Sequence, residues 1–197
     1  MNIFMQDEET SKEKQGEPAQ VERLFFKSRT IIVAGTINDK LAQRTVTHMM
    51  ALAEESDAPI NMFISSPGGH VESGDMVHDM IKFIRPVVRT IGSGWVASAG
   101  ALIFVGAKKE NRFCLPNTRF PAASTKRRCW RFLPGHRNRG RADHQDARAV
   151  DRLFAAATGR TPERISKDTQ RDFWLNTDEA IAYGLLGKVI SSSDELK

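Results

Sequence analysis

The chain has little cysteine and no long hydrophobic run, and each absence excludes a class of protein. Only two cysteines, Cys114 and Cys129, occur in 197 residues. The sequence therefore has neither a disulfide framework nor the cysteine spacing of a zinc site. No apolar segment approaches the roughly 20 residues that span a bilayer. We expect a reducing, cytoplasmic setting, no membrane partner, and no metal or other cofactor.

The first 22 residues also lack the apolar centre of a signal peptide. They begin MNIFMQDEETSKEKQGEPAQ, which is polar and charged. We expect a mobile tail over residues 1–22 and one domain over 23–197, a length that can bury its own core.

Net basic charge is confined to one segment of the chain. The formal net charge is +5, but residues 121–149 contain eight Lys or Arg and two Asp, a net +6, which leaves the remainder at −1. Trp130 and Phe132 lie among these arginines, a composition that would suit contacts to nucleic acid. A nucleic-acid-binding module is therefore one hypothesis, although the rest of the chain predicts no nucleic-acid partner.

Short apolar runs alternate with helical patterns along most of the sequence. This alternation predicts an α/β fold with a largely parallel sheet. Residues 119–141 are the exception and show neither a strand nor a helix pattern. Strands are expected at Thr30–Ala34, Ile60–Ile64, Val87–Ile91, Phe113–Leu115 and Lys188–Ile190, and helices after Asn38, after SSPGGH, over Ala97–Val105, Asp151–Ala157 and Pro162–Lys167, and in TDEAIAYGLLG.

Two turns at strand ends contain residues suited to catalysis. After Ile64, SSPGGH places Gly68 and Gly69 at the start of a helix, where backbone N–H groups can bind an oxyanion. After Ile91, GSGWVASAG places Ser98 among small residues at another helix start, where a serine can act as a nucleophile. A plain tight turn and a small packing residue are the alternative interpretations.

The two turns, together with the later segment KDTQRDFW…EAIAYGLLGKVI, resemble the proteolytic subunit of ATP-dependent Clp proteases. The resemblance runs from about residue 29 to residue 190, outside the basic segment. It implies a crotonase-like α/β head with a helical handle and a serine endopeptidase that cleaves unfolded proteins to short peptides. It assigns Ser98 as nucleophile, the Gly69 and Ala99 N–H groups as oxyanion hole, and Asp172 as the acid that orients a histidine.

The resemblance also implies partners. The chain has no GxxxxGK[ST] motif of its own, so a separate ring-forming ATPase unfoldase would deliver unfolded protein substrates. Self-assembly into two stacked heptameric rings is implied as well.

The histidine that this family requires is missing. It should occur in an apolar-apolar-His-Gln-Pro-Ser-Gly-Gly element after the strand FCLPNTRF, and its position here is Ala123. The five histidines present are expected to be non-catalytic: His48, His70, His78, His136 and His144.

The genetic code offers an explanation for the missing histidine. When the first base of the codons for PAASTKRRCWR (residues 121–131) is dropped, the remaining bases permit Leu-Leu-His-Gln-Pro-Ser-Gly-Gly-Val-Gly-Gly, with the histidine at position 123. Residues 137–146 likewise become compatible with Ala-Ile-Glu-Ala-Glu-Leu-Thr-Ile-Arg-Thr, which has helical propensity. We infer a one-base insertion near codon 121 and a one-base loss near codon 149, in the genome or in sequencing.

Three alternatives to an active peptidase subunit remain open at this point. A catalytically impaired structural or regulatory subunit of the same complex would fit the literal sequence. A crotonase-type acyl-CoA enzyme would share the broad fold but would not need Ser98 paired with Asp172. The nucleic-acid module described above is the third.

Overall fold

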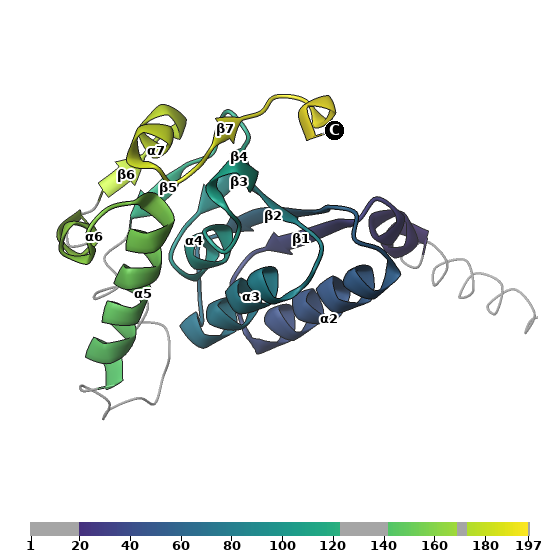
Figure 1. Cartoon of the computed structure of the whole chain (residues 1–197), viewed down its shortest axis with the longest axis horizontal. Coiled ribbons are helices and arrows are strands. Elements are labelled where there is room, and N and C mark those ends of the chain that lie inside the picture. The colour runs from purple at the N-terminus through teal and green to yellow at the C-terminus, as the bar shows by residue number, and fades with distance from the viewer. Residues whose placement is uncertain (1–19, 123–141, 169–172, 197) are drawn as a thin grey trace, which may run out of the picture.

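The computed structural model describes residues 20–122, 142–168 and 173–196 (Figure 1). A helix over residues 20–27 precedes the first strand. The elements that follow are β1 (Thr30–Ala34), α2 (Asp39–Glu55), β2 (Ile60–Ser66), α3 (Val71–Phe83), β3 (Val88–Val96), α4 (Ala99–Phe104), η1 (Lys109–Asn111), β4 (Arg112–Cys114), β5 (Phe120–Ala122), α5 (Ala142–Thr158), α6 (Pro162–Asp168), β6 (Phe173–Leu175), α7 (Thr177–Tyr183), β7 (Lys188–Val189) and η3 (Ser193–Leu196).

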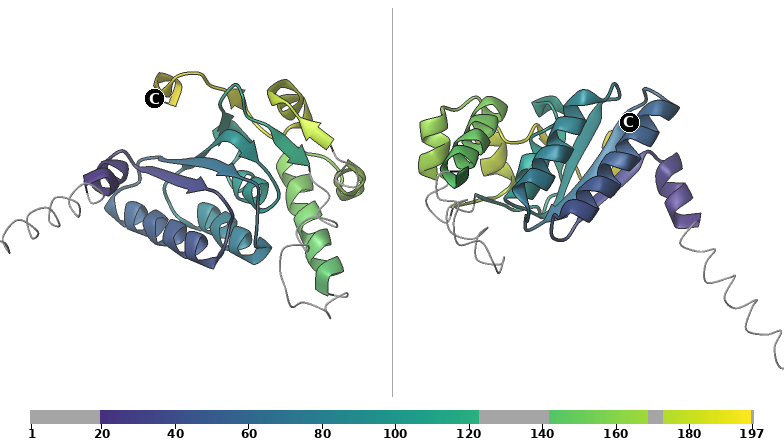
Figure 2. Two further views of the ribbon diagram at one scale, coloured as in Figure 1. Left: turned by 180° about the vertical axis from the view of Figure 1, so that it is seen from behind. Right: turned by 90° about the horizontal axis from the view of Figure 1, so that it is seen from below.

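A five-stranded sheet in the order β1-β2-β3-β4-β7 forms the centre of the fold, and each neighbouring pair is parallel. Figures 1 and 2 show α2 and α3 side by side along one face of this sheet. The predicted α/β fold with a parallel sheet is therefore confirmed. A separate antiparallel pair, β5-β6, lies beside α5, α6 and α7.

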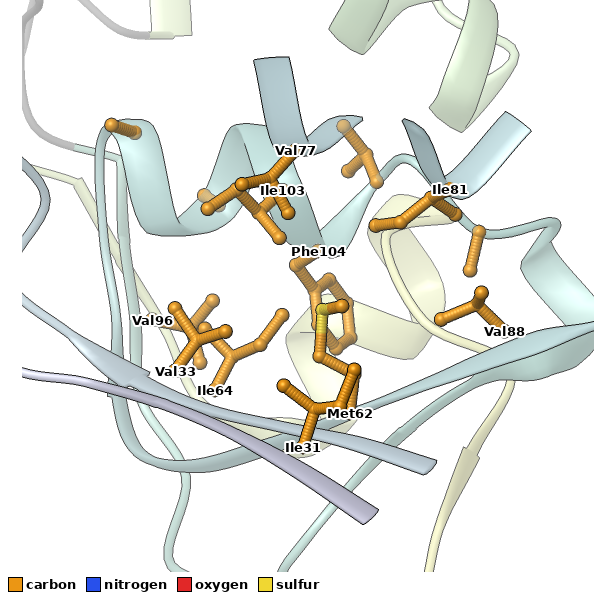
Figure 3. Close-up of a cluster of buried hydrophobic side chains, with 14 of the residues drawn as sticks. Ile31, Val33, Met62, Ile64, Val77, Ile81, Val88, Val96, Ile103 and Phe104 are labelled. Carbon is orange, nitrogen blue, oxygen red and sulfur yellow. The ribbon is translucent and has the colours of Figure 1, made fainter. Parts of the chain in front are cut away.

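The hydrophobic core lies between the sheet and its helices, as Figure 3 shows. Alternate residues of β2 point into it, and Ile60, Met62 and Ile64 are all fully buried. Phe104 of α4 is also fully buried and its ring lies 5.3 Å from that of Phe120. Because successive strand residues face opposite sides, the period-2 burial of β2 fixes which side of the sheet α3 and α4 cover.

The third strand is longer than its sequence pattern predicts. The expected end of this strand at Ile91 is wrong, since β3 continues to Val96. The register with β2 shifts between Ile64 and Ser66, and Gly94 takes a positive φ of 66°. Such a bulge absorbs the glycines without ending the pairing. The strand consequently extends almost to Ser98.

The described ends of the basic region have regular structure, contrary to expectation. Phe120–Ala122 forms β5, which pairs with β6, although residues 119–141 show no strand pattern. At the other end α5 begins at Ala142, nine residues before the predicted start at Asp151. Adding a residue to an existing helix costs less than nucleating one, so alanine- and arginine-rich sequence can extend a helix toward its N-terminus.

The C-terminal helix α7 confirms the prediction of a capped helix that ends at a glycine. The Asn176 side chain accepts a hydrogen bond from the Glu179 N–H, and the Glu179 carboxylate accepts one from the Asn176 N–H. Gly184 ends the helix in the left-handed conformation, with φ 87°. None of the described helices combines the length and the apolar character needed to cross a membrane.

Arg112 connects the sheet to the C-terminal helices. Its guanidinium donates to the carbonyls of Val105, Ala107, Ala157 and Leu185 at 2.7–3.2 Å, and the residue is only 4% exposed. Burial lowers the pKa of Arg112 to about 10, so the group stays charged at neutral pH. Carbonyls at or just beyond the C-terminal ends of three helices, where the helix dipole is negative, stabilise this cation.

We expect Arg112→Met to lower the free energy of unfolding by about 3 kcal/mol or more, because four carbonyls lose their donor and each unsatisfied buried group costs about 1–3 kcal/mol. Urea unfolding would measure the change. Arg85→Met is the matched control, since Arg85 forms an exposed ion pair with Asp57 at 3.0 Å, a type worth less than about 1 kcal/mol. Equal losses in the two variants would contradict the role assigned to Arg112.

Candidate active site

Ser98 occupies a strained turn between β3 and α4. Its φ is 49° and its ψ −124°, and it is one of two non-glycine residues with positive φ in the described part of the chain. Such a conformation costs on the order of 1–3 kcal/mol and persists only where the surroundings enforce it. A strained serine between a strand and a helix is the geometry that exposes a nucleophilic hydroxyl.

Backbone hydrogen bonds on both sides enforce this turn. Ala97 donates its N–H to Ser66 O at 3.0 Å, and Ala97 O accepts from the Gly100 N–H at 2.8 Å. The Leu102 N–H donates to Ser98 O at 3.0 Å and starts α4. Ser98 is half-buried, while Ala97 and Ala99 are buried. The small residues of GSGWVASAG therefore allow the close packing that holds Ser98 in place.

The glycine turn of SSPGGH lies directly against Ser98. A Cβ added to Gly68 would stand 2.5 Å from Ser98 Cβ and 3.0 Å from its Oγ. No side chain fits there, so only glycine allows this approach. The structure thus brings together the two turns that the sequence singled out from segments 30 residues apart along the chain, at Gly68 and Ser98.

The backbone N–H of Gly69 points away from Ile37, the residue with which Gly69 forms an isolated parallel bridge. The Ile37 N–H donates to Gly68 O and the His70 N–H donates to Ile37 O, both at 2.9 Å, and together these bonds form a parallel bridge between Ile37 and Gly69. In a parallel ladder the residue between two such bonds turns its own N–H to the opposite side. Ala99 is the first residue of α4, and the N–H of that position has no partner within its helix. The two predicted oxyanion-hole residues, Gly69 and Ala99, therefore lie in the two turns that meet at Gly68 and Ser98.

Hydrogen bonds from polar side chains hold the SSPGGH turn in place. The fully buried Ser66 hydroxyl donates to Gly35 O at 2.6 Å and accepts from the Gly68 N–H at 3.0 Å. His70 Nδ1 lies 2.8 Å from Ser73 Oγ and 3.0 Å from Asp39 Oδ1. These contacts tie the turn to the first turns of α2 and α3. Hydrogen bonds from Ser73 and the nearby imidazole lower the pKa of Asp39.

A cleft opens beside Ser98 between α4, α5 and β5. It spans about 790 Å³, a volume that includes the open solvent at its mouth. Its walls are largely apolar, and Ser98 and Ala99 form part of them. Other residues along the cleft are Val71, Leu102, Asp151, Phe154 and Leu185. A hydroxyl at the edge of an apolar cleft suits a reaction on a chain that inserts an apolar side chain.

Two predicted site positions lie outside the described residues. These are Asp172 and position 123, which adjoin β6 and β5 in the sequence. Of the histidines, His48 and His78 lie on the predicted helices α2 and α3. His78 is 2% exposed, and burial lowers its pKa. His136 lies outside the described part of the chain.

Sequence patterns did not single out the residues that support the site. Ser66 stands in the SSPGG motif, but its bond to Gly35 connects positions 31 residues apart. Asp151 reaches the cleft only because α5 packs beside α4. Neither contact has a periodicity or spacing that would reveal it.

Comparison with known proteins identifies the family. A Clp protease family model matches residues 13–193. The chain is 65% identical over 175 residues to the ATP-dependent Clp protease proteolytic subunit of Paracoccus denitrificans, covering 85% of this chain and 84% of that protein. It is 48% identical over 182 residues to proteolytic subunit 2 of Pseudomonas aeruginosa, with 90% and 89% covered. The solved structure of ClpP1 from Listeria monocytogenes superposes with a TM-score of 0.80 at 42% identity, covering 90% of this chain and 99% of that one. The chain belongs to the Clp protease family and is a peptidase subunit.

Proposed function

We propose that the chain is a serine endopeptidase subunit in which Ser98 is the nucleophile. The observation that carries the proposal is the strained Ser98 turn packed against Gly68. The Ser98 Oγ would attack a peptide carbonyl, and the Gly69 and Ala99 N–H groups would stabilise the resulting oxyanion. The adjacent apolar cleft would hold the substrate side chain that precedes the scissile bond.

The strand pair β5-β6 supports a histidine at position 123 with Asp172 as its partner. Ala122 pairs with Phe173 and Phe120 with Leu175 in an antiparallel register. Positions 123 and 172 are the next residues along the chain from the Ala122–Phe173 pair. A histidine restored there by the frame correction would have an acidic neighbour to fix its tautomer and orientation.

The strand pair also lies against the strand that leads to Ser98. The Val96 N–H donates to Arg119 O at 3.0 Å, and the Arg119 N–H donates to Gly94 O at 2.8 Å. The rings of Trp95 and Trp174 lie 5.3 Å apart. These contacts connect β3 to both β5 and β6, which supports a shared site for residues from all three strands.

The proposed mechanism is acyl transfer in two steps. The histidine at 123 would take the Ser98 proton as the Oγ–carbon bond forms, then give a proton to the leaving amine as the peptide C–N bond breaks. Water would hydrolyse the ester by the same route. In the chain as written, Ala123 cannot move a proton.

The partners follow from what the relatives are. They are named proteolytic subunits of an ATP-dependent Clp protease, so we propose a separate ring-forming ATPase unfoldase as partner and unfolded proteins as substrates. Assembly into two stacked heptameric rings, in the cytoplasm, belongs to the same proposal.

A second candidate is a non-catalytic subunit of the same complex, because the sequence has Ala123 where the base is needed. One experiment on protein from the native source separates the two. Labelling with a fluorophosphonate followed by peptide mass spectrometry reports both the residues at 121–131 and the state of Ser98. Probe on Ser98 together with a Leu-Leu-His-Gln-Pro peptide supports the peptidase. An unlabelled Ser98 together with PAASTKRR would favour the non-catalytic subunit.

A further inference from the structure

The imidazole of His70, the residue after Gly69, lies between two carboxylates. Its Nδ1 is 3.0 Å from Asp39 Oδ1 and its Nε2 is 3.0 Å from Glu72 Oε2. Asp39 is the first residue of α2, and Glu72 lies in the first turn of α3. These two carboxylates are the charged groups in contact with the ring in the described part of the chain. The ring thus connects the SSPGGH turn to the starts of two helices.

The contacts around the ring require a proton on each ring nitrogen. The Ser73 hydroxyl donates its one proton to Asp39 Oδ1 at 2.6 Å, so Ser73 Oγ accepts from His70 Nδ1, which lies 2.8 Å away. On the other side, the Glu72 carboxylate can only accept. A neutral imidazole has one N–H, whereas the imidazolium has two. The hydrogen bonds around the ring are therefore complete only in its protonated form.

The backbone of His70 belongs to the turn that contains Gly69. The His70 N–H donates to Ile37 O, and the Ile37 N–H donates to Gly68 O, both at 2.9 Å. Asp39 follows Ile37 by two residues, so one short segment holds both the backbone and the side chain of His70. The side chain is 43% exposed, and its ring can exchange a proton with solvent. A change in the charge of the ring therefore acts directly beside the predicted Gly69 donor.

We propose that His70 is a positioning residue whose protonated imidazole fixes the Gly69 turn for catalysis. The inference rests on the proposed role of Ser98. Histidine is the side chain whose charge ordinarily changes between pH 5 and 8. At the acidic end of this range both N–H groups donate to carboxylates. At the alkaline end one nitrogen turns a lone pair toward a carboxylate oxygen, so the turn loosens as the pH rises. Asp39 stays ionised throughout, because the hydrogen bond from Ser73 and the charge of His70 lower its pKa.

Two substitutions separate the charge of His70 from its shape. His70→Gln has no charge at any pH, whereas His70→Arg is always charged and has enough N–H groups to donate to both carboxylates. His48→Gln, at a histidine farther along α2, is the matched control. Since exposed ion pairs are weak, the expected effects are three- to fivefold rather than larger.

Hydrogen exchange of the full chain as written tests the turn itself. Mass spectrometry would follow peptides that contain the amides of Ile37 and Gly68, which are hydrogen-bonded within the turn. Each rate is divided by that of the unmutated chain at the same pH, so that the chemical effect of pH on exchange cancels. We expect His70→Gln to exchange about three- to fivefold faster at pH 6 and at nearly the same rate at pH 8. His70→Arg should match the unmutated chain at pH 6 and exchange more slowly at pH 8, and His48→Gln should match it at both.

Steady-state kinetics of the frame-corrected chain test the consequence for catalysis. At pH 6, His70→Gln should lower kcat about three- to fivefold and leave KM unchanged, because an oxyanion donor acts on charge that develops in the transition state. At pH 8, His70→Arg should have a higher kcat than the corrected chain. Ratios taken at each pH remove the titration of the catalytic histidine, which all of these chains share.

Three results would overturn the proposal. The first is equal exchange in the unmutated chain, His70→Gln and His70→Arg at both pH values. The second is a His70→Arg protein that behaves like His70→Gln, since charge would then be irrelevant. The third is altered exchange with unaltered kcat, because the turn would then move without consequence for the reaction. A corrected chain that hydrolyses no peptide would instead overturn the proposed function, and the catalytic role of His70 with it, whatever the exchange of the turn shows.

Discussion

Expression of the gene with one base removed at codon 121 and one added at codon 149 is expected to raise peptide hydrolysis by a factor of about 10⁴. The change places a histidine at position 123, where the sequence as written has Ala123. Without a general base the Ser98 hydroxyl keeps its proton and attacks slowly. What remains is the catalysis by the oxyanion groups and by substrate binding, about 10³–10⁴ over water.

The rate of release of a fluorescent amine from a short peptide would measure this gain. The matched control carries the same frame correction with an alanine codon at position 123, so that the rewritten segment is present and only the imidazole is absent. Ser98→Ala in the corrected chain should return the rate to that of the control, because residues of one triad act as a unit. A corrected chain less than tenfold faster than the control would contradict the assignment of position 123.

The described strands give a structural reason for the expected gain in the rate of peptide hydrolysis. β5 ends at Ala122 and β6 begins at Phe173, and these two residues pair. The described strands thus end one residue short of positions 123 and 172, the two positions of the proposed histidine–aspartate pair. A histidine placed there would supply the general base that the chain as written lacks, which is why one imidazole is expected to have so large an effect.

The parallel sheet was predictable because each of its strands is a short apolar run whose pattern survives in the fold. The two turns were predictable as well, since consecutive glycines and a serine among small residues leave few backbone geometries. The bulge in β3 was not, because the same glycines permit both a turn and a bulge, and pairing with β2 and Arg119 decides between them. A sequence shows that the backbone at these glycines is flexible. It does not show which neighbouring segment determines the conformation that they adopt.

Charged residues show the same limit more clearly. Arg112 and Arg85 look alike in the sequence, yet one is buried among four carbonyls and the other forms an exposed ion pair. In the sequence Asp151 looks like a surface acid on an amphipathic helix. Only the packing of α5 beside α4 places it in the cleft. The functional weight of a charge depends on contacts between distant segments, which no local pattern records.

Gly69→Ala in the frame-corrected chain is expected to lower kcat by about 10²–10³ with little change in KM. The added methyl would stand 2.1 Å from Ile37 O and 2.8 Å from Ile37 N. Both are backbone atoms that cannot swing aside, so the turn must move and carry the Gly69 N–H away from the oxyanion. The loss of one such donor costs kcat about this much. Because the donor acts on charge that develops only in the transition state, KM is spared.

Gly35→Ala is the control for backbone strain alone. Gly35 also has a positive φ, 81°, but a Cβ there meets nothing within 4 Å. It should cost about 1 kcal/mol of stability and leave kcat unchanged. Thermal melting of both variants, beside steady-state kinetics, separates a damaged fold from a displaced donor. A Gly69→Ala protein that melts like the Gly35→Ala control and retains kcat within threefold of the corrected chain would remove Gly69 from the oxyanion hole. A fall in kcat without a comparable fall in melting temperature would indicate that the Gly69 N–H stabilises the transition state.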